Sequence, residues 1–214
     1  MAELKIILAD DHAVVRQGVK QILIGAFPNA VFGEASNAHD LLALVRRERW
    51  DIVVLDLTMP GSTGLDMLKL IKHEHPPLPV LILSMYPEDQ FAVRAVRAGA
   101  AGYLNKEGAP EELVLALRKI LAGGNYISEA VADELVMHSR QESDGPLHEQ
   151  LSDREYQVLC MIASGKSIKE IGAELSLSPA TVSTYRARIL QKMGMTTSAQ
   201  LMQYAIQNGL VLRD

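Results

Sequence analysis

Carboxylate, hydroxyl and ammonium side chains follow the apolar runs in the first half of this sequence. Asp10 and Asp11 follow the first run, Asp56 the third, Ser84 the fourth and Lys106 the fifth. Clustered carboxylates repel one another, so a hard divalent cation such as Mg²⁺ is the expected counter-ion. A lysine would neutralise further charge, and a hydroxyl would bind a transferred phosphoryl oxygen. The set therefore predicts an aspartate that accepts a phosphoryl group.

Each of these residues, taken singly, has a simpler explanation as a helix N-cap or as part of a solvated loop. Five such residues, all placed at the ends of apolar runs, are difficult to explain by chance. We therefore favour one shared pocket over five unrelated caps.

The elements that must position these side chains alternate between strand and helix. Short apolar runs predict strands at 4–9, 31–35, 51–55, 79–83 and 102–104. Amphipathic segments between them predict helices, and Pro110 occupies the first turn of the last one. Repeated strand–helix units imply a parallel sheet with helices on both faces. In such sheets, chemistry collects at the carboxyl ends of the strands.

The pattern changes after Gly123-Gly124. A short helix is predicted at 128–138, and a polar stretch at 140–149 predicts a linker. From Leu151 onward only helices fit, including one opened by a capping box and one opened by Ser178-Pro179. We therefore predict a first domain at 1–124, a linker with a short helix at 125–149, and a four-helix, all-α domain at 150–214.

The third helix of the rear domain has two different faces. Val182, Ile189 and Met193 fall on one face at about 100° per residue, which predicts a buried side. The opposite face carries Thr181, Thr184, Arg188, Gln191 and Lys192. Short hydroxyl groups, an amide and cations are suited to contact phosphates and base edges in a DNA major groove. The alternative is that this face is polar only because it is exposed to solvent.

Composition narrows the classes of protein. The 214 residues are 48% hydrophobic and 22% charged, which is ordinary for a globular chain. The net charge of −5 excludes a globally basic coat for nucleic acid, and the acidic excess lies in residues 1–147. We expect no membrane segment and no signal peptide. The single Cys160 cannot form an intramolecular disulfide, so we expect a cytoplasmic protein.

The polar set of the front domain resembles the receiver domain of two-component response regulators, through Asp10-Asp11, Asp56-Leu57-Thr58-Met59-Pro60-Gly61, Ser84 and Lys106. The resemblance implies an α/β, flavodoxin-like fold with a five-stranded parallel sheet. It implies that Asp56 is the phosphoacceptor, with Ser84 and Lys106 contacting the phosphoryl group. Asp11, Asp56 and the Thr58 carbonyl would hold Mg²⁺, and Asp10 would act mainly through bound water.

Tyr103 occupies the position of the aromatic switch residue in that family. The alternative interpretation is that Tyr103 is simply a half-buried aromatic residue of a strand. Many receivers carry proline after the lysine, whereas Lys106 is followed by Glu107. Kinase recognition, by analogy with the family, falls on the first helix around Val14, Val15 and Gln17.

The rear domain resembles the LuxR-type helix-turn-helix. The motifs that carry the resemblance are Leu151-Ser152-Asp153-Arg154-Glu155, Ile162-Ala163-Ser164-Gly165-Lys166-Ser167, Ile171-Gly172-Ala173-Glu174-Leu175 and Thr181-Val182-Ser183-Thr184-Tyr185-Arg186-Ala187-Arg188-Ile189-Leu190. Together the two domains resemble a NarL/FixJ-type response regulator. The DNA contacts that this implies are Lys166, Thr181, Ser183, Thr184, Tyr185, Ala187, Arg188 and Lys192.

Two features of the rear domain have alternative interpretations. Arg186 lies near the buried face, so we favour an ion pair with Glu155 inside the domain over a DNA contact. The helix at 198–207 resembles the helix through which members of the family dimerise. The alternative is that it only packs against the core of its own domain.

The function implied by the resemblance is a phosphorylation-activated transcription factor that is not an enzyme. Its partners would be a sensor histidine kinase, double-stranded promoter DNA and, when phosphorylated, a second copy of the chain, with no membrane partner. Phosphorylation would relieve inhibitory packing between the domains. One alternative is a regulator that binds DNA without phosphorylation. Another is an aspartyl-phosphate phosphatase, which needs a second aspartate where this chain has Thr58.

Overall fold

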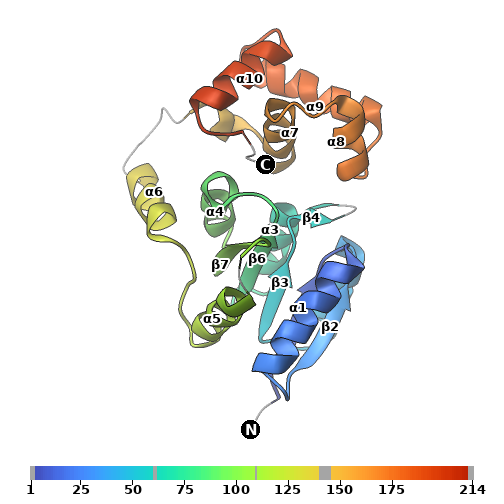
Figure 1. Cartoon of the computed structure of the whole chain (residues 1–214), viewed down its shortest axis with the longest axis vertical. Coiled ribbons are helices and arrows are strands. Elements are labelled where there is room, and N and C mark those ends of the chain that lie inside the picture. The colour runs from blue at the N-terminus through green and yellow to red at the C-terminus, as the bar shows by residue number, and fades with distance from the viewer. Residues whose placement is uncertain (1–2, 60–61, 109, 140–145, 212–214) are drawn as a thin grey trace. The chain divides into compact units, whose positions relative to one another are not determined.

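The chain forms two compact units, Met1–Leu135 and Val136–Asp214. The computed structural model describes residues 3–59, 62–108, 110–139 and 146–211. Figure 1 shows the course of the chain through both units. None of the helices in these ranges is long and apolar enough to cross a membrane.

The first unit is built on a parallel sheet of five strands, as predicted. The strands are β1 (Lys5–Ala9), β2 (Val31–Ala35), β3 (Ile52–Leu55), β6 (Val80–Ser84) and β7 (Gly102–Asn105). Their order across the sheet is β2-β1-β3-β6-β7. The strand order reverses at β1, so a crevice is expected beside the carboxyl ends of β1 and β3.

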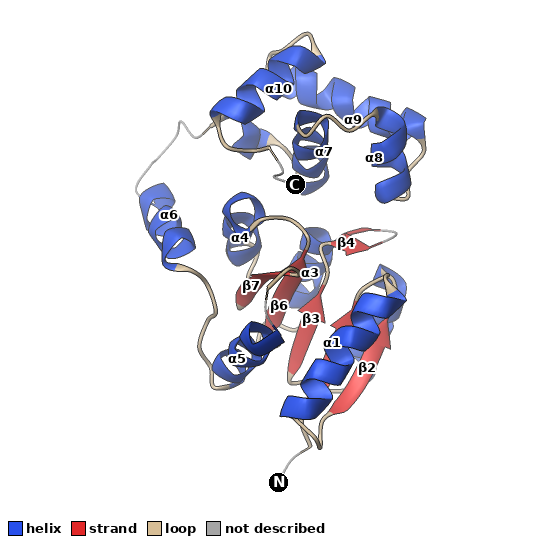
Figure 2. Ribbon diagram, viewed as in Figure 1, coloured by secondary structure: helices blue, strands red, loops and turns tan. Residues whose placement is uncertain are grey.

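Helices cover both faces of this sheet. They are α1 (Ala13–Ala26), α2 (Ala38–Arg47), α3 (Gly64–Glu74), α4 (Glu88–Arg97) and α5 (Pro110–Leu121). Figure 2 shows α1 and α5 in front of the strands, and these two helices contact each other. The strands therefore need apolar residues on both sides, which explains why β3 is wholly buried.

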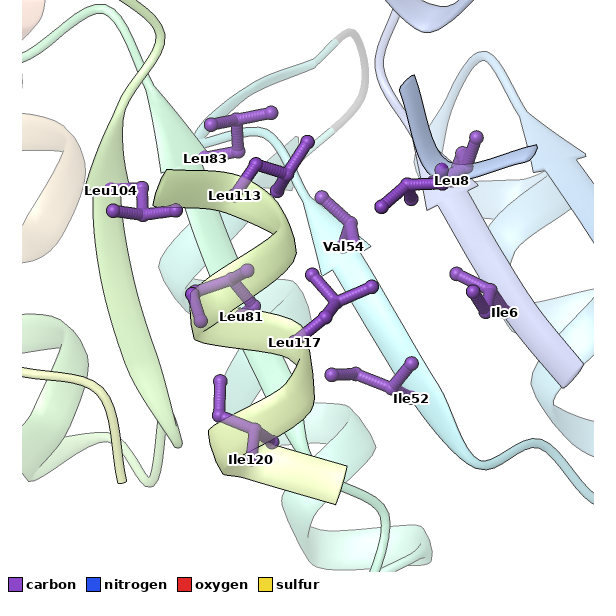
Figure 3. Close-up of a cluster of buried hydrophobic side chains, with 12 residues drawn as sticks. Ile6, Leu8, Ile52, Val54, Leu81, Leu83, Leu104, Leu113, Leu117 and Ile120 are labelled. Carbon is purple, nitrogen blue, oxygen red and sulfur yellow. The ribbon is translucent and has the colours of Figure 1, made fainter. Parts of the chain in front are cut away.

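The core between α5 and the sheet is apolar throughout. Figure 3 shows Leu113, Leu117 and Ile120 of α5 among side chains from four of the strands. The strand side chains labelled there are Ile6, Leu8, Ile52, Val54, Leu81, Leu83 and Leu104. This packing fixes the strand register, and with it the positions of the strand ends.

A two-stranded hairpin follows β3 and was not predicted. It consists of β4 (Thr58–Met59) and β5 (Ser62–Thr63). Pro60-Gly61, between the two strands, lie outside the described residues. Strands of two residues carry no periodicity that a sequence reader can detect.

The segment after α5 is attached to the edge of the sheet. The Tyr126 N–H donates to the Ala101 carbonyl at 2.8 Å, and the Tyr103 N–H donates to the Tyr126 carbonyl at 3.2 Å. The Ser128 N–H donates to Glu88 Oε1 at 3.2 Å, just before α6 (Glu129–Ser139) begins. The start of the predicted linker is thus hydrogen-bonded to β7 and α4.

The second unit is helical, as predicted. It contains a 3₁₀ turn η1 (Leu147–Gln150) and helices α7 (Asp153–Ala163), α8 (Ile168–Glu174), α9 (Pro179–Lys192) and α10 (Ser198–Gln207). Reciprocal capping boxes open α7, α8 and α10, and Ser178 caps α9 with proline in its first turn. The predicted inner face of α9 is buried at Val182, Ile189 and Met193.

Gly102→Ala is expected to loosen the attachment of the linker to β7. A Cβ at this position would lie 2.7 Å from the Tyr126 carbonyl oxygen and 3.0 Å from Leu81 Cδ1. We expect the free energy of unfolding to fall by about 1–3 kcal/mol and the amide of Tyr126 to exchange faster with deuterium.

Gly18→Ala is the matched control, because a Cβ added to this helical glycine would meet no atom within 4 Å. It should be neutral or slightly stabilising. Unchanged exchange at Tyr126 in Gly102→Ala would contradict the expectation.

Candidate functional site

The predicted polar residues meet at the carboxyl edge of the sheet. Asp10 and Asp56 directly follow β1 and β3, Ser84 ends β6, and Lys106 follows β7. Backbone hydrogen bonds tie these ends together: the Asp56 N–H donates to the Ala9 carbonyl at 2.9 Å, and the Lys106 N–H donates to the Ser84 carbonyl at 2.8 Å. The pairing of the strands therefore fixes the positions of the loops that carry these side chains.

Lys106 bridges two of the carboxylates. Its Nζ lies 2.7 Å from Asp10 Oδ2 and 2.8 Å from Asp56 Oδ2, and all three side chains are almost completely buried. Burial alone would lower the pKa of Lys106, but the carboxylates of Asp56 and Asp10 outweigh this effect and raise it. The ammonium therefore stays charged.

Every polar atom of Asp10 has a hydrogen-bond partner. Its N–H donates to the Ala35 carbonyl at 3.1 Å, and its carbonyl accepts from Arg16 at 2.6 Å. Its Oδ1 accepts the His12 N–H at 2.7 Å, and its Oδ2 accepts from Lys106. Asp10 is thus held in place at both carboxylate oxygens, and each oxygen keeps a lone pair that a metal-bound water can use.

Two buried carboxylate oxygens close by lack a hydrogen bond. They are Asp11 Oδ1 and Asp56 Oδ2. Asp11 Oδ1 lies 2.9 Å from His12 Nδ1 without hydrogen-bonding geometry, and Asp56 Oδ2 is compensated only by the Lys106 ammonium 2.8 Å away, which it shares with Asp10. Buried oxygens left in this state are costly unless a cation binds them.

Ligand atoms of Asp10, Asp11, His12 and Asp56 all lie within 4.8 Å of one another. The orphaned oxygens and an all-carboxylate core fit a hard divalent cation. His12 was not selected by sequence analysis, although its place directly after the acidic pair was a signal.

Burial raises the pKa of Asp56 from 3.8 to about 6. Lys106 and a hydrogen bond from the Thr58 backbone act in the opposite direction and do not cancel this effect. Without a bound metal ion, the ionised form of Asp56 is therefore disfavoured in the fold.

Asp56→Asn should consequently stabilise the metal-free protein above pH 6. The unfolded chain loses the Asp56 proton near pH 4 and the folded chain near pH 6, so the wild type loses stability as the pH rises through this window. We expect the variant to be about 2–3 kcal/mol more stable at pH 8 and equal to wild type below pH 4. Urea titrations in EDTA across this range would measure the difference. A pH-independent difference would contradict desolvation of the Asp56 carboxylate as its cause.

Ser84 and Tyr103 are joined through the backbone of Tyr86. Ser84 Oγ accepts the Tyr86 N–H at 3.1 Å, and the Tyr103 hydroxyl donates to the Tyr86 carbonyl at 2.7 Å. Tyr103 is only 1% exposed, so its side chain points into the unit rather than being half-buried. The Tyr86 ring stacks on Phe91 of α4, with centroids 4.6 Å apart.

In the second unit, α9 exposes a polar face with few cations. Among the predicted DNA contacts on this helix, the exposed residues are Ser183, Thr184, Ala187, Arg188 and Lys192, and the partly buried ones are Thr181 and Tyr185. The hydroxyls of Ser183 and Thr184 donate to backbone carbonyls four residues earlier, at 2.9 and 3.0 Å. Lys166 pairs with Glu174 of α8.

The predicted ion pair between Arg186 and Glu155 is wrong. Glu155 binds Lys192, with Nζ 2.6 Å from Oε2, whereas Arg186 Nε donates to Ser198 Oγ at 2.6 Å. Glu155 lies in the first turn of α7, beside the end of α9. Arg186 lies halfway along α9, from which its guanidinium reaches the start of α10.

Lys192→Met is expected to lower the free energy of unfolding by about 1–2 kcal/mol. Glu155 is almost fully buried, and desolvation would raise its pKa, but Lys192 and Ser152 together hold that pKa below its ordinary value. Removing the cation leaves a buried carboxylate without its ion-pair partner, and the 42% exposure of Lys192 moderates the loss. Arg188→Met, on the same helix, should change stability by less than about 0.5 kcal/mol. Equal losses in chemical denaturation would contradict this assignment.

The fold and the two sites define a receiver unit followed by a helix-turn-helix unit. Residues 6–118 match the response regulator receiver domain, and residues 149–205 match the luxR family of bacterial regulatory proteins. The chain belongs to the response regulators of the NarL/FixJ family, as its motifs predicted.

Relatives share this organisation along almost their whole length. Response regulator GacA of Pseudomonas aeruginosa is 37% identical over 210 residues, which cover 97% of this chain and 98% of GacA. Response regulator UvrY of Escherichia coli K12 is 34% identical over 209 residues, covering 97% of this chain and 95% of UvrY. A structure of RcsB from Salmonella enterica serovar Typhimurium, bound to promoter rprA in the presence of phosphomimetic BeF3-, has a TM-score of 0.62. It is 25% identical and covers 95% of this chain and 98% of RcsB.

Proposed function

We propose that this protein is a phosphorylation-dependent, DNA-binding transcription regulator, with Asp56 as its phosphoacceptor and a sensor histidine kinase as its phosphoryl donor. The observation that carries the proposal is the buried Asp56 carboxylate, which lies 2.8 Å from the Lys106 ammonium and beside the acidic pair. A helix-turn-helix unit on the same chain supplies the output.

In this reaction an Asp56 carboxylate oxygen attacks phosphorus, an O–P bond forms, and the N–P bond to the donor histidine breaks. The leaving imidazole nitrogen keeps the electron pair and takes up a proton. Lys106 lies 2.8 Å from Asp56 Oδ2 and would neutralise charge on the transferred group. The Ser84 hydroxyl would donate to a phosphoryl oxygen.

Mg²⁺ is the proposed cofactor, held by Asp11, Asp56 and the Thr58 carbonyl, with Asp10 acting through water. When bound, it would neutralise charge on the carboxylates and on the phosphoryl oxygens. The hydrogen bonds that occupy both carboxylate oxygens of Asp10 and the buried Asp11 oxygen without a hydrogen bond support this division of roles.

Tyr103 is the proposed switch residue. Its side chain is bound to the Tyr86 carbonyl and its backbone to Tyr126 of the linker, so a change at Ser84 has a covalent and hydrogen-bonded route to residue 126. We propose that phosphorylation changes this route, favours a dimer and increases promoter binding.

The DNA-contacting residues are proposed to be Lys166, Thr181, Ser183, Thr184, Tyr185, Ala187, Arg188 and Lys192. The exposed face of α9 supports this assignment, and Arg188 is its best cationic candidate because Lys192 and Lys166 already bind carboxylates. On α10, Leu201 and Ala205 are buried and Ile206 is 66% exposed, so Ile206 is a large apolar side chain that the helix offers to a partner copy.

We keep the receiver at 1–124, the linker at 125–149 and the DNA-binding domain at 150–214 as proposed boundaries. A promoter-binding protein acts where the chromosome is, so we propose a cytoplasmic location with no membrane partner. The aspartyl phosphate forms on the chain itself and serves as a switch, so we do not classify the protein as an enzyme. The alternative is DNA binding that does not depend on phosphorylation, and a comparison of the two forms of the protein on DNA separates it from the proposal.

Incubation with acetyl phosphate and Mg²⁺ should add a single phosphoryl group, about 80 Da, to the wild type. Asp56→Ala should gain none. Intact-mass spectrometry measures the adduct, and gel shifts with promoter DNA before and after phosphorylation measure its consequence. An adduct on Asp56→Ala would move the phosphoacceptor elsewhere. Equal DNA binding with and without the adduct would favour the phosphorylation-independent alternative.

A further inference from the structure

A guanidinium group lies against the backbone of the acidic pair and has no part in the phosphoryl transfer itself. Arg16, in the first turn of α1, donates from Nη1 to the Asp10 carbonyl at 2.6 Å and from Nε to Glu34 Oε2 at 3.0 Å. Its side chain is 15% exposed and borders a small void behind Asp10 and Asp56.

The Asp10 carbonyl belongs to the planar peptide unit that joins Asp10 to Asp11. Arg16 therefore holds the plane from which the Asp11 Cα, and with it the Asp11 side chain, projects. Because the Asp10 N–H is bound to the Ala35 carbonyl, the backbone is held on both sides of the Asp10 Cα. The orphaned Asp11 oxygen is thus carried on a fixed peptide.

We propose that Arg16 is a positioning residue for metal binding: it fixes the Asp10–Asp11 peptide so that the Asp11 carboxylate is preorganised for a divalent cation. The inference rests on the proposed function, since it concerns the same Mg²⁺ site. The planar guanidinium fork spans two acceptors, one on β2 and one in the loop after β1, which a single ammonium cannot match.

Electrostatics alone predicts the opposite effect. A cation beside a metal site repels the metal, so removing Arg16 would tighten Mg²⁺ binding if its charge were the main influence. That charge is offset by Glu34, which also accepts from Lys20 at 2.7 Å and from Gln17 at 3.0 Å. The Lys20 and Arg16 cations hold the pKa of Glu34 below its ordinary value. Positioning is therefore expected to dominate.

The test is the Mg²⁺ dissociation constant of the full-length protein, measured by titration calorimetry on wild type, Arg16→Met, Arg16→Lys and Lys20→Met. We expect Arg16→Met to raise the dissociation constant about tenfold or more. Arg16→Lys keeps the charge and should still bind Mg²⁺ more weakly than wild type. Lys20→Met removes another cation from Glu34 without touching Asp10, and should leave the constant within about twofold of wild type.

The rate of Asp56 phosphorylation by acetyl phosphate gives a second readout. In Arg16→Met it should fall at Mg²⁺ concentrations below saturation and recover to near the wild-type rate at saturation. A general loss of structure would not be reversed in this way. If Arg16→Met fails to fold, as judged by circular dichroism, the comparison of Arg16→Lys with Lys20→Met decides.

Unchanged or tighter Mg²⁺ binding in the Arg16 variants would overturn the inference. Equal weakening in Lys20→Met would also overturn it, because the effect would then run through Glu34. If wild type binds Mg²⁺ and forms the adduct while these patterns fail, only the positioning role is lost. If wild type neither binds Mg²⁺ nor forms the adduct, the proposed function fails first, and this inference fails with it.

Discussion

The ammonium of Lys106 between the carboxylates of Asp10 and Asp56 is the contact on which the receiver site depends. It joins residues that follow three different strands and are as far as 96 positions apart in the chain. Its buried partners would be left uncompensated by its loss. The contact exists only if β1, β3, β6 and β7 are neighbours in register, and the apolar layer beneath α5 enforces that arrangement. The geometry of the site therefore depends directly on the packing of the apolar core.

The two units treat a buried acid in opposite ways. In the second unit, Glu155 Oε2 accepts from the Ser152 N–H and from Lys192, and both contacts are structural. In the first, Asp10 and Asp56 share one ammonium, an oxygen of Asp11 has no hydrogen bond, and the pKa of Asp56 is raised to about 6. Unsatisfied buried oxygens lower the stability of the metal-free fold, and a ligand that binds them recovers it by mass action. That difference separates a closed structural pair from a pocket built to bind.

Much of this was predictable because parallel strands end at a common edge. Asp10, Asp56, Ser84 and Lys106 could be assigned to one pocket from their positions after apolar runs. The partner of Glu155 could not, because it depends on how α7 crosses α9, and helical periodicity does not contain that angle. The sequence favoured Arg186 because it lies near the buried face of α9, and only the packing of α7 against α9 shows that Lys192 is the partner.

The hydrogen bonds of Tyr126 to the edge of the sheet could not be predicted from the sequence either, because a single bridging residue leaves no sequence pattern. It matters because it completes a route from the pocket. The Ser84 hydroxyl accepts from Tyr86, and a hydroxyl can accept and donate at once. In the proposed reaction it could therefore donate to a phosphoryl oxygen without releasing Tyr86. The Tyr86 carbonyl holds the Tyr103 hydroxyl, and the Tyr103 N–H holds Tyr126. These hydrogen bonds connect the end of β6 to Tyr126 through Tyr86 and Tyr103, and this is the route that the proposed switch would use.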